Sequence, residues 1–358
     1  MYRNTKNVPY YVFGRGSLAQ LGDLLKPRRE AVDGPVVYFV DHFFRDHELI
    51  DRLPMEKGDQ LHFVDSSSEP EVTRIDAFKE AVSAADSRTP CCVVGIGGGN
   101  ALDTAKAVAN LLTNPGKAED YQGWELVKNP AVYKIGIPTL SGTGSECSRT
   151  CVLTNIPKNL KLGMNSDYTV YDQLLLDPDL LATVPRDQYF YTGIDTFMHC
   201  VESLQGSYRN AIIDAFSVRA VQLCEEIFLS DDMMSEENRE KMMIASYIGG
   251  MAAGNVGVIH PFSAGLGVVL HVAHGLGNCL ALNVLGDIYP KEYKQFRTMI
   301  ERQGVNLPTG ICKDLTEEQY EGLYRGCIVH EKPLTNALGP DFKQILTREN
   351  LIERYKSI

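Results

Sequence analysis

The chain has 358 residues, of which 44% are hydrophobic and 23% charged, a globular composition long enough for two domains with their own cores. Its formal net charge of −11 excludes nucleic acid and anionic membranes as general partners, because both need a basic surface. No apolar run reaches the ~18 residues of a membrane span, and the N-terminus lacks the apolar stretch of a signal peptide. We therefore expect a cytoplasmic protein whose nine cysteines are reduced.

Short β-rich runs alternate with helical patterns in the first half of the chain. Strands are expected at 35–41, 60–64, 91–96 and 133–138, and helices at 71–85 and 101–112. Continuous apolar strands separated by helices predict a parallel sheet covered by helices on both faces. Ligands of such sheets bind at the carboxyl ends of the strands.

Asp41 ends the first of these strands and is the candidate anchor for a cofactor ribose. A carboxylate at this position accepts hydrogen bonds from the ribose hydroxyls and repels a 2′-phosphate, which favours NAD over NADP. The alternative is an aspartate that ends a strand and binds no ligand.

The strand expected at 91–96 leads into three consecutive glycines, Gly97, Gly98 and Gly99, and then into a helix. Glycines let the backbone approach a ligand closely, and free N–H groups at a helix N-terminus form a seat for a pyrophosphate. We predict Asn100 as the N-cap, with Asp103 three residues later in a capping arrangement. The loop differs from the common dinucleotide fingerprint, and a tight turn that binds nothing is the alternative.

The second half of the chain reads as helical, because the β-rich runs stop after Leu176. Thr183 is the expected N-cap of a helix that starts near Pro185, and further helices are expected at 211–229 and 236–253. We therefore expect two domains, an α/β domain at 1–180 and an all-α domain at 181–358.

Asp195 and His199 lie four residues apart in the first of these helices, a spacing that puts both side chains on one face. His260 and His274 come from a later glycine-rich stretch. Three imidazoles and one carboxylate suit a divalent cation such as Zn²⁺ or Fe²⁺. The spacing alone leaves open a surface ion pair for the first two residues and core histidines for the other two.

These motifs together resemble the iron-containing (group III) alcohol dehydrogenase family, whose members are related to dehydroquinate synthase. The resemblance rests on four ordered segments: GGGNALD at 97–103, PTLSGTGSE at 138–146, GIDTFMH at 193–199, and His274 with Gly275. It implies an N-terminal α/β nucleotide-binding domain with a parallel sheet, followed by an all-α metal-binding domain. It also implies a homodimer that holds one zinc or iron ion per chain, with Asp195, His199, His260 and His274 as the catalytic metal ligands.

The resemblance further implies NAD(P), with NAD favoured, and a set of cofactor contacts. These comprise the pyrophosphate loop, the ribose acid, the segment beside the nicotinamide, a lysine that reaches a ribose, and two leucines of the cofactor cleft. The residues are Gly97, Gly98, Gly99, Asn100, Ala101, Asp103, Asp41, Thr139, Leu140, Thr143, Ser145, Lys161, Leu180 and Leu181. Taken alone, Lys161 would be a solvated charge and the leucines ordinary core.

Two places depart from the family pattern. Ala264 stands where many members carry a histidine assigned to proton relay; His271 is a candidate replacement, although a packed helix residue is the favoured interpretation. Arg149 and Thr150 stand where members that act on small alcohols have apolar residues. A guanidinium there could bind a substrate carboxylate, and a surface salt bridge is the alternative.

The activity implied by the resemblance is metal-dependent oxidation of a primary alcohol to an aldehyde, with hydride transfer to the nicotinamide. Within the family, the chain resembles members that oxidise C8 of the acidic sugar 3-deoxy-D-manno-octulosonate (Kdo) for lipopolysaccharide biosynthesis. The expected substrate is therefore a small polar molecule, an anionic sugar acid. The alternatives are an NAD(P)-dependent dehydrogenase or reductase of a small alcohol or diol, a non-redox enzyme like dehydroquinate synthase, and a nucleotide sensor.

Overall fold

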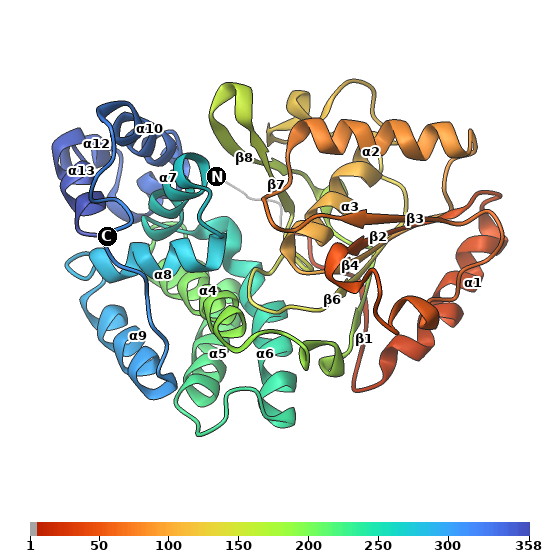
Figure 1. Ribbon diagram of the computed structural model, residues 1–358, viewed down its shortest axis with the longest axis horizontal. Coiled ribbons are helices and arrows are strands. Elements are labelled where there is room, and N and C mark those ends of the chain that lie inside the picture. Colours follow the sequence, from red (N-terminus) through yellow and green to blue (C-terminus); the bar gives the residue numbers. More distant parts are fainter. Residues whose placement is uncertain (1–5) are drawn as a thin grey trace. The chain divides into compact units, whose positions relative to one another are not determined.

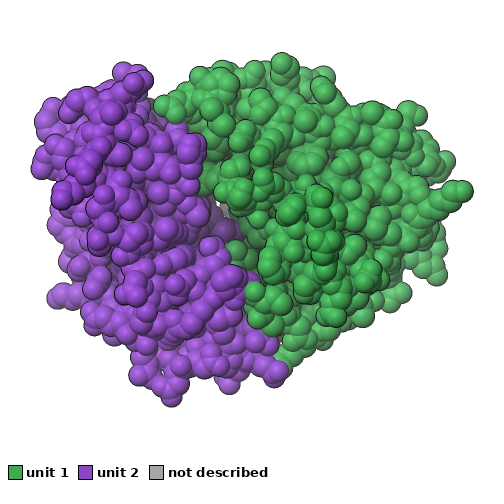
Figure 2. Space-filling view, in the orientation of Figure 1, with its two compact units in different colours: residues 1–140, 145–183 green, residues 141–144, 184–358 purple. Residues whose placement is uncertain are grey.

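The computed structural model describes residues 6–358, and the chain divides into two compact units (Figure 2). Unit 1 extends to Leu140 and continues from Ser145 to Thr183, whereas unit 2 contains Ser141–Gly144 and Val184–Ile358. The sequence placed a single boundary after residue 180. It did not anticipate that four residues of the 138–146 segment would belong to the helical unit.

A six-stranded sheet forms the centre of unit 1, and all of its neighbouring strands are parallel, as the continuous apolar runs predicted (Figure 1). The strand order is β1-β9-β6-β4-β2-β3. The strands are β1 (Tyr10–Phe13), β2 (Val36–Asp41), β3 (Gln60–Val64), β4 (Cys92–Gly97), β6 (Lys134–Pro138) and β9 (Gln173–Leu176).

Each face of this sheet packs against helices. Successive side chains of a strand point to opposite faces, so Phe39 of β2 lies in one buried cluster, with α2 (Val72–Ala85) and α3 (Gly99–Leu111). Tyr38 lies in another cluster, with α1 (Leu21–Ala31). The carboxyl ends of β2 and β4 are adjacent, since Val40 pairs with Ile96. Asp41 and the glycine loop therefore meet at one edge of the sheet.

A smaller three-stranded sheet in unit 1 was missed by the sequence analysis. It consists of β5 (Gly123–Trp124), β7 (Thr150–Asn155) and β8 (Leu160–Asn165). β7 and β8 are antiparallel, and Asn159 turns the chain between them with φ +52°. In the sequence of β7, the β-branched residues Thr150, Val152 and Thr154 alternate with Cys151 and Leu153, and this period of two was the signal that could have revealed a strand.

Every regular element described in unit 2 is a helix, which confirms the all-α prediction for this part of the chain (Figure 1). The first, α4, has Pro185 as its N-cap, so the predicted cap at Thr183 was wrong. The helices are α4 (Arg186–Gln205), α5 (Ala211–Phe228), α6 (Glu236–Gly249), α7 (Ile259–Leu270), α8 (His274–Val284), α9 (Pro290–Gln303), α10 (Glu317–Ile328), α11 (Glu331–Leu338), α12 (Phe342–Ile345) and α13 (Arg348–Lys356).

Short 3-10 helices complete the chain. They are η1 (Ser17–Gln20), η2 (His42–Phe44), η3 (Ile50–Arg52), η4 (Ala118–Tyr121), η5 (Ile156–Lys158), η6 (Asp167–Thr169), η7 (Pro178–Leu181) and η8 (Gly250–Asn255). Within residues 6–358, no single helix has both the length and the apolar character to cross a membrane. One pair of segments, Glu236–Asn255 and Ile259–Leu270, has the required length and composition when taken together, but the pair is bent by 91°.

The Ser141–Gly144 segment belongs to unit 2 because its backbone lies directly against the helices. The Gly142 N–H donates to Ser246 Oγ over 2.7 Å, and Thr196 Oγ1 donates to the Gly142 carbonyl over 2.9 Å. A Cβ on Gly142 would lie 1.7 Å from the Thr192 carbonyl oxygen, and one on Gly144 would lie 2.3 Å from the Gly250 Cα. Only glycines permit this approach, and both have positive φ.

Candidate metal centre and cofactor loop

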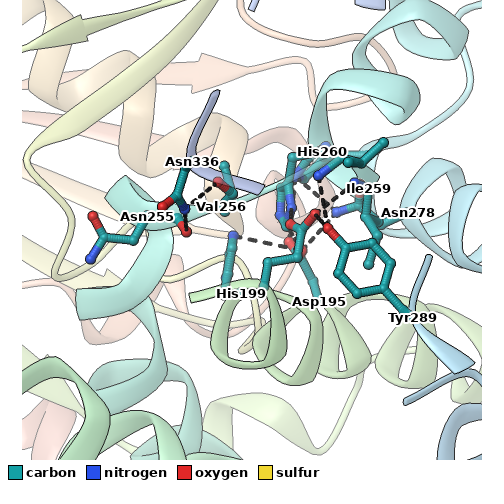
Figure 3. Close-up of polar contacts among 12 residues, drawn as sticks. Asp195, His199, Asn255, Val256, Ile259, His260, Asn278, Tyr289 and Asn336 are labelled. Carbon is teal, nitrogen blue, oxygen red and sulfur yellow. Dashed lines mark hydrogen bonds and ion pairs between the residues drawn. The ribbon is translucent and has the colours of Figure 1, made fainter. Parts of the chain in front are cut away.

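The predicted metal ligands lie together in unit 2, and Figure 3 labels three of them, Asp195, His199 and His260. Asp195, His260 and His274 each offer a ligand atom, and these atoms lie within 4.8 Å of one another. Asp195 Oδ1 is 3.1 Å from His260 Nε2, and Asp195 Oδ2 is 3.5 Å from His274 Nε2. His199 Nε2 is 3.7 Å from Asp195 Oδ1, and its ring stacks on that of His260 with centroids 4.5 Å apart.

Three helices bring these side chains together. Asp195 and His199 share one face of α4, as their spacing predicted, while His260 lies in the first turn of α7 and His274 opens α8. The approach of α8 to α4 requires a small residue, because a Cβ on Gly275 would lie 2.5 Å from the Tyr191 carbonyl oxygen. The glycine beside His274 therefore allows this histidine to reach Asp195.

Burial and charge define the protonation of the cluster. Burial alone would raise the pKa of Asp195, but the surrounding imidazoles hold it below its usual range. Burial lowers the pKa of His199 to about 4, which leaves a neutral imidazole. Burial also lowers the pKa of His260, but the carboxylates of Glu202 and Asp195 outweigh it and raise this pKa to about 9. Asp195 Oδ2 is buried without a hydrogen-bond partner, so this set of donors fits a divalent cation.

Two further polar residues border the cluster, and the sequence analysis missed both. Asn278 Nδ2 donates to Asp195 Oδ1 over 2.7 Å and lies 3.2 Å from His274 Nε2. Glu202 contacts His260 Nδ1 with one carboxylate oxygen and accepts from the backbone with the other. Helical spacing was the available signal, because Glu202 lies two turns after Asp195 on α4 and Asn278 one turn after His274 on α8.

The glycine loop in unit 1 has the backbone that close packing requires. Gly97 has φ +151°, and a Cβ there would lie 2.6 Å from Ala101 Cβ and 2.9 Å from Asp41 Cβ. The N-cap of α3 is Gly98, and no side chain caps the helix. The first N–H groups of α3 are therefore without a side-chain cap, which fits an anionic ligand such as a pyrophosphate.

The predicted roles of Asn100 and Asp103 in capping were wrong, because α3 begins two residues earlier than expected. Asn100 Nδ2 instead donates to the carbonyls of Ser66 and Ser68, at 3.3 Å and 2.9 Å, and so holds the loop after β3. Asp103 accepts from the Val152 N–H over 2.8 Å and contacts Ser145 Oγ. Both side chains therefore connect α3 to other segments of unit 1.

Asp41 lies beside this loop and has its own structural partners. Its Oδ1 accepts from the Phe43 N–H over 3.0 Å, which caps η2, and from Ser66 Oγ over 2.9 Å. The same Ser66 offers its carbonyl to Asn100, so hydrogen bonds join the glycine-loop helix to the ends of β3 and β2. The predicted ribose anchor and the predicted pyrophosphate loop thus form one continuous edge.

The other predicted cofactor residues are distributed over several places. The Thr139 N–H donates to the Gly97 carbonyl over 3.0 Å, and Leu140 packs against Gly98. Thr143 belongs to unit 2. Lys161 Nζ lies 2.5 Å from Glu69 Oε1, so it is paired rather than solvated. Leu180 and Leu181 are both buried, and Leu180 lies in the core cluster that contains Tyr38.

The sequence analysis did not single out Lys106, which supports the segment predicted to flank the nicotinamide. Lys106 is fully buried in α3, and its ammonium donates to the Ser145 carbonyl over 2.8 Å and the Ser148 carbonyl over 3.2 Å. It also contacts the Thr150 carbonyl and lies 3.7 Å from Asp103 Oδ1. A buried lysine thus ties the start of β7 to the glycine-loop helix.

Arg149, the predicted substrate anchor, has two carboxylate partners of its own. Its Nε donates to Asp167 Oδ1 over 2.6 Å and its Nη2 to Glu125 Oε1 over 2.5 Å. Glu125 follows β5 and Asp167 follows β8, so the three-stranded sheet brings both acids to the guanidinium. The salt bridge left as the alternative is therefore the arrangement found. Thr150, predicted to line the substrate site with it, opens β7 and receives Lys106 at its carbonyl.

The structure also shows where the two positions considered for proton relay lie. Ala264 is buried in α7. His271 is exposed and forms the C-cap of α7 in the left-handed conformation, with φ +56°. The interpretation of His271 as a packed helix residue was therefore wrong, and its role as a relay stays a prediction.

Comparisons with known proteins agree with this architecture. Residues 9–178 match the family model described as iron-containing alcohol dehydrogenase, and residues 189–322 match the C-terminal model of the Fe-containing alcohol dehydrogenase family. A sulfoacetaldehyde reductase of Bilophila wadsworthia is 36% identical over 208 residues, which cover 56% of this chain and 53% of the relative. The chain thus spans about half the length of that relative.

Two more proteins extend the similarity over more of the chain. An NAD-dependent methanol dehydrogenase of Bacillus methanolicus is 29% identical over 75% of this chain and 71% of its own length. The crystal structure of a sulfoacetaldehyde reductase from Bifidobacterium kashiwanohense in complex with NAD+ superposes with a TM-score of 0.79 at 24% identity, over 99% of this chain and 98% of that one. The last likeness shows the fold. Since the two family models follow one another along the chain and together cover most of it, the chain belongs to the iron-containing alcohol dehydrogenase family.

Proposed function

We propose that this protein is a metal-dependent, NAD-linked oxidoreductase that interconverts a primary alcohol and an aldehyde. The observation that carries the proposal is the convergence of His199, His260 and His274 on Asp195, a fully buried carboxylate of unit 2. Chance core histidines would not surround one buried carboxylate that has an oxygen without a hydrogen-bond partner.

In this proposal the four residues hold one divalent ion, zinc or iron. When bound, such an ion supplies Lewis-acid polarisation of the substrate oxygen and lowers the pKa of the hydroxyl. The residues themselves contribute one negative charge from Asp195 and neutral nitrogen donors, of which His199 is neutral already because of its burial. Asn278 holds Asp195 Oδ1 in place and thereby orients the carboxylate.

We assign the cofactor to the edge of unit 1. The uncapped N-terminus of α3, with Gly97, Gly98 and Gly99, would receive the pyrophosphate, and Asp41 would accept from the adenine ribose. NAD supplies the hydride acceptor. Support comes from the printed names of the relatives, one an NAD-dependent dehydrogenase and another crystallised with NAD+. The remaining predicted contacts are also part of this proposal, namely Thr139, Leu140, Thr143, Ser145, Lys161, Leu180 and Leu181.

For the substrate we propose a small, polar, anionic molecule, and the sequence resemblance makes the C8 alcohol of Kdo the first to test. The relatives named sulfoacetaldehyde reductase favour a second candidate, a short anionic aldehyde that is reduced in the opposite direction. A cytoplasmic location and a homodimer are further parts of the proposal.

The decisive experiment removes and restores the metal. Protein stripped with a chelator is reloaded with Zn²⁺ or Fe²⁺ and assayed by NADH absorbance, with oxygen uptake followed in parallel. The substrates are Kdo, 2-hydroxyethanesulfonate, methanol and 1,2-propanediol, with sulfoacetaldehyde and NADH for the reverse reaction. We expect turnover only with metal and the best kcat/KM on an anionic substrate. Full activity of the stripped protein would overturn the proposal, and so would a loaded protein that forms no NADH from any of these alcohols and consumes none with sulfoacetaldehyde.

A further inference from the structure

Glu202 is a buried carboxylate that contacts a predicted metal ligand, His260, without being a predicted ligand itself. It lies on α4 with 1% of its surface exposed. One oxygen, Oε2, meets His260 Nδ1 in a short contact, and the other, Oε1, accepts from the Ile259 N–H over 2.6 Å. Within the described residues, His260 is its only ion-pair partner.

The contact with Glu202 decides which nitrogen of His260 would keep its proton when a metal binds. An ionised carboxylate only accepts hydrogen bonds, so Nδ1 must be the donor to Glu202. The same rule makes Nε2 a donor to Asp195 Oδ1, 3.1 Å away, as long as no ion lies between them. A cation held by the predicted ligands would take the place of the Nε2 proton, whereas the Nδ1 proton would stay with Glu202, so Nε2 is the nitrogen that would offer its lone pair to the ion.

The same carboxylate also fixes the helix that carries His260. The N-cap of α7 is Val258, whose side chain makes no capping hydrogen bond. Glu202 Oε1 takes the first N–H of the helix, that of Ile259, while Tyr289 OH accepts from the Val258 N–H over 3.0 Å and lies 3.2 Å from Glu202 Oε1. A residue of α4 therefore caps α7, and a negative charge at a helix N-terminus is favourable.

Charge balance gives this arrangement a further consequence. Asp195 and Glu202 are both fully buried acids at one site, and a divalent ion bound among neutral imidazoles would match their two negative charges. Carboxylates that accept from the second nitrogen of a ligating histidine fix the ring and increase its basicity.

We propose that Glu202 is a positioning residue of the metal centre, which presents Nε2 of His260 to the ion and strengthens divalent metal binding. This inference rests on the proposed function, because it concerns how a predicted ligand is presented. It differs from that function in what it predicts, namely the affinity for the metal and the tautomer of one ring.

The test is Glu202→Gln, which preserves the shape but replaces an acceptor with an amide that can donate to Nδ1. Zn²⁺ and Co²⁺ dissociation constants are measured by chelator competition, and we expect both to rise by about 10- to 100-fold. The matched control is Asp59→Asn in unit 1, which also turns a buried, hydrogen-bonded carboxylate into an amide. Its metal affinity should stay within about twofold of wild type, because distant sites act independently.

A second measurement needs no folded variant at position 202. Long-range 15N–1H spectra of the zinc-loaded protein with 15N-labelled histidine should show one ring protonated at Nδ1 with a strongly hydrogen-bonded proton, assigned by its loss in His260→Ala. Unchanged metal affinity in Glu202→Gln, or a His260 ring protonated at Nε2, overturns the inference. A wild-type protein that binds zinc but neither oxidises an alcohol nor reduces an aldehyde in the assay above overturns the proposed function and leaves the role of Glu202 standing.

Discussion

Replacing Gly97 with alanine tests the cofactor loop most directly. Gly97 has φ +151°, where side chains are strained, and an added Cβ would lie 2.6 Å from Ala101 Cβ and 2.9 Å from Asp41 Cβ. Both neighbouring atoms are attached directly to the backbone and cannot swing away. The backbone conformation costs about 1–3 kcal/mol and the overpacking about 1–3 kcal/mol more. We therefore expect Gly97→Ala to destabilise unit 1 by about 4 kcal/mol.

Gly14 provides a matched control, because it has φ +143° but a Cβ there would meet nothing within 4 Å. Gly14→Ala should show only the conformational cost of about 2 kcal/mol. A loss of 1 kcal/mol lowers Tm by roughly 2–4 °C in a domain of this size. The two variants should therefore differ by about 4–8 °C in thermal unfolding.

The functional effect should separate the two glycines even more clearly. The new methyl group at Gly97 would push α3 away from Asp41. These are the two parts of the proposed cofactor seat, so their separation should weaken cofactor binding. We expect NADH binding, measured by fluorescence titration, to weaken at least ~10-fold in Gly97→Ala, about 1.4 kcal/mol, and to stay unchanged in Gly14→Ala. If Gly97→Ala is no less stable than the control, the steric reasoning is wrong. If it binds NADH normally, the loop is not the cofactor seat.

Three further predictions concern the metal, the cofactor and stability. His274→Ala should lower turnover more than ~100-fold, because mutating residues that only hydrogen-bond to a metal ligand already lowers metal affinity or activity by about 10- to 100-fold. Retained activity with no bound metal would contradict this prediction. Asp41→Ala should reduce the preference for NAD over NADP by roughly tenfold, because the acid repels a 2′-phosphate, and an unchanged kcat/KM ratio would exclude that role. Asp59→Asn should cost about 3 kcal/mol in chemical denaturation, since it breaks a two-pronged pair with Arg29, at 2.9 and 2.6 Å, and a cost near zero would refute it. Burial raises the pKa of Asp59, but the Arg29 guanidinium and two backbone N–H groups hold it below its usual 3.8. The contribution of Asp59 to folding stability is therefore present above about pH 4 and is lost as the pH falls through the lowered pKa. The Asp59→Asn variant should lack this acid-dependent loss of stability.

Short-range patterns in the sequence determined the elements and the motifs. Continuous apolar runs predicted the parallel strands, such as β2 ending at Asp41, because a sheet covered on both faces needs apolar residues at every position. The i, i+4 spacing put Asp195 and His199 on one face of α4, since helix geometry alone fixes that relation. The order of the motifs was enough to indicate the family.

Only the tertiary structure decided which polar groups meet. Arg149 pairs with Glu125 and Asp167, and Asn100 holds the loop after β3 instead of capping its own helix. Glu202 contacts His260 from another helix. Spacing along one element cannot reveal such partners, because each pair joins segments that fold next to one another while lying far apart in the chain. The partners of a buried polar side chain depend on which segments pack around it, and that packing is a property of the whole fold.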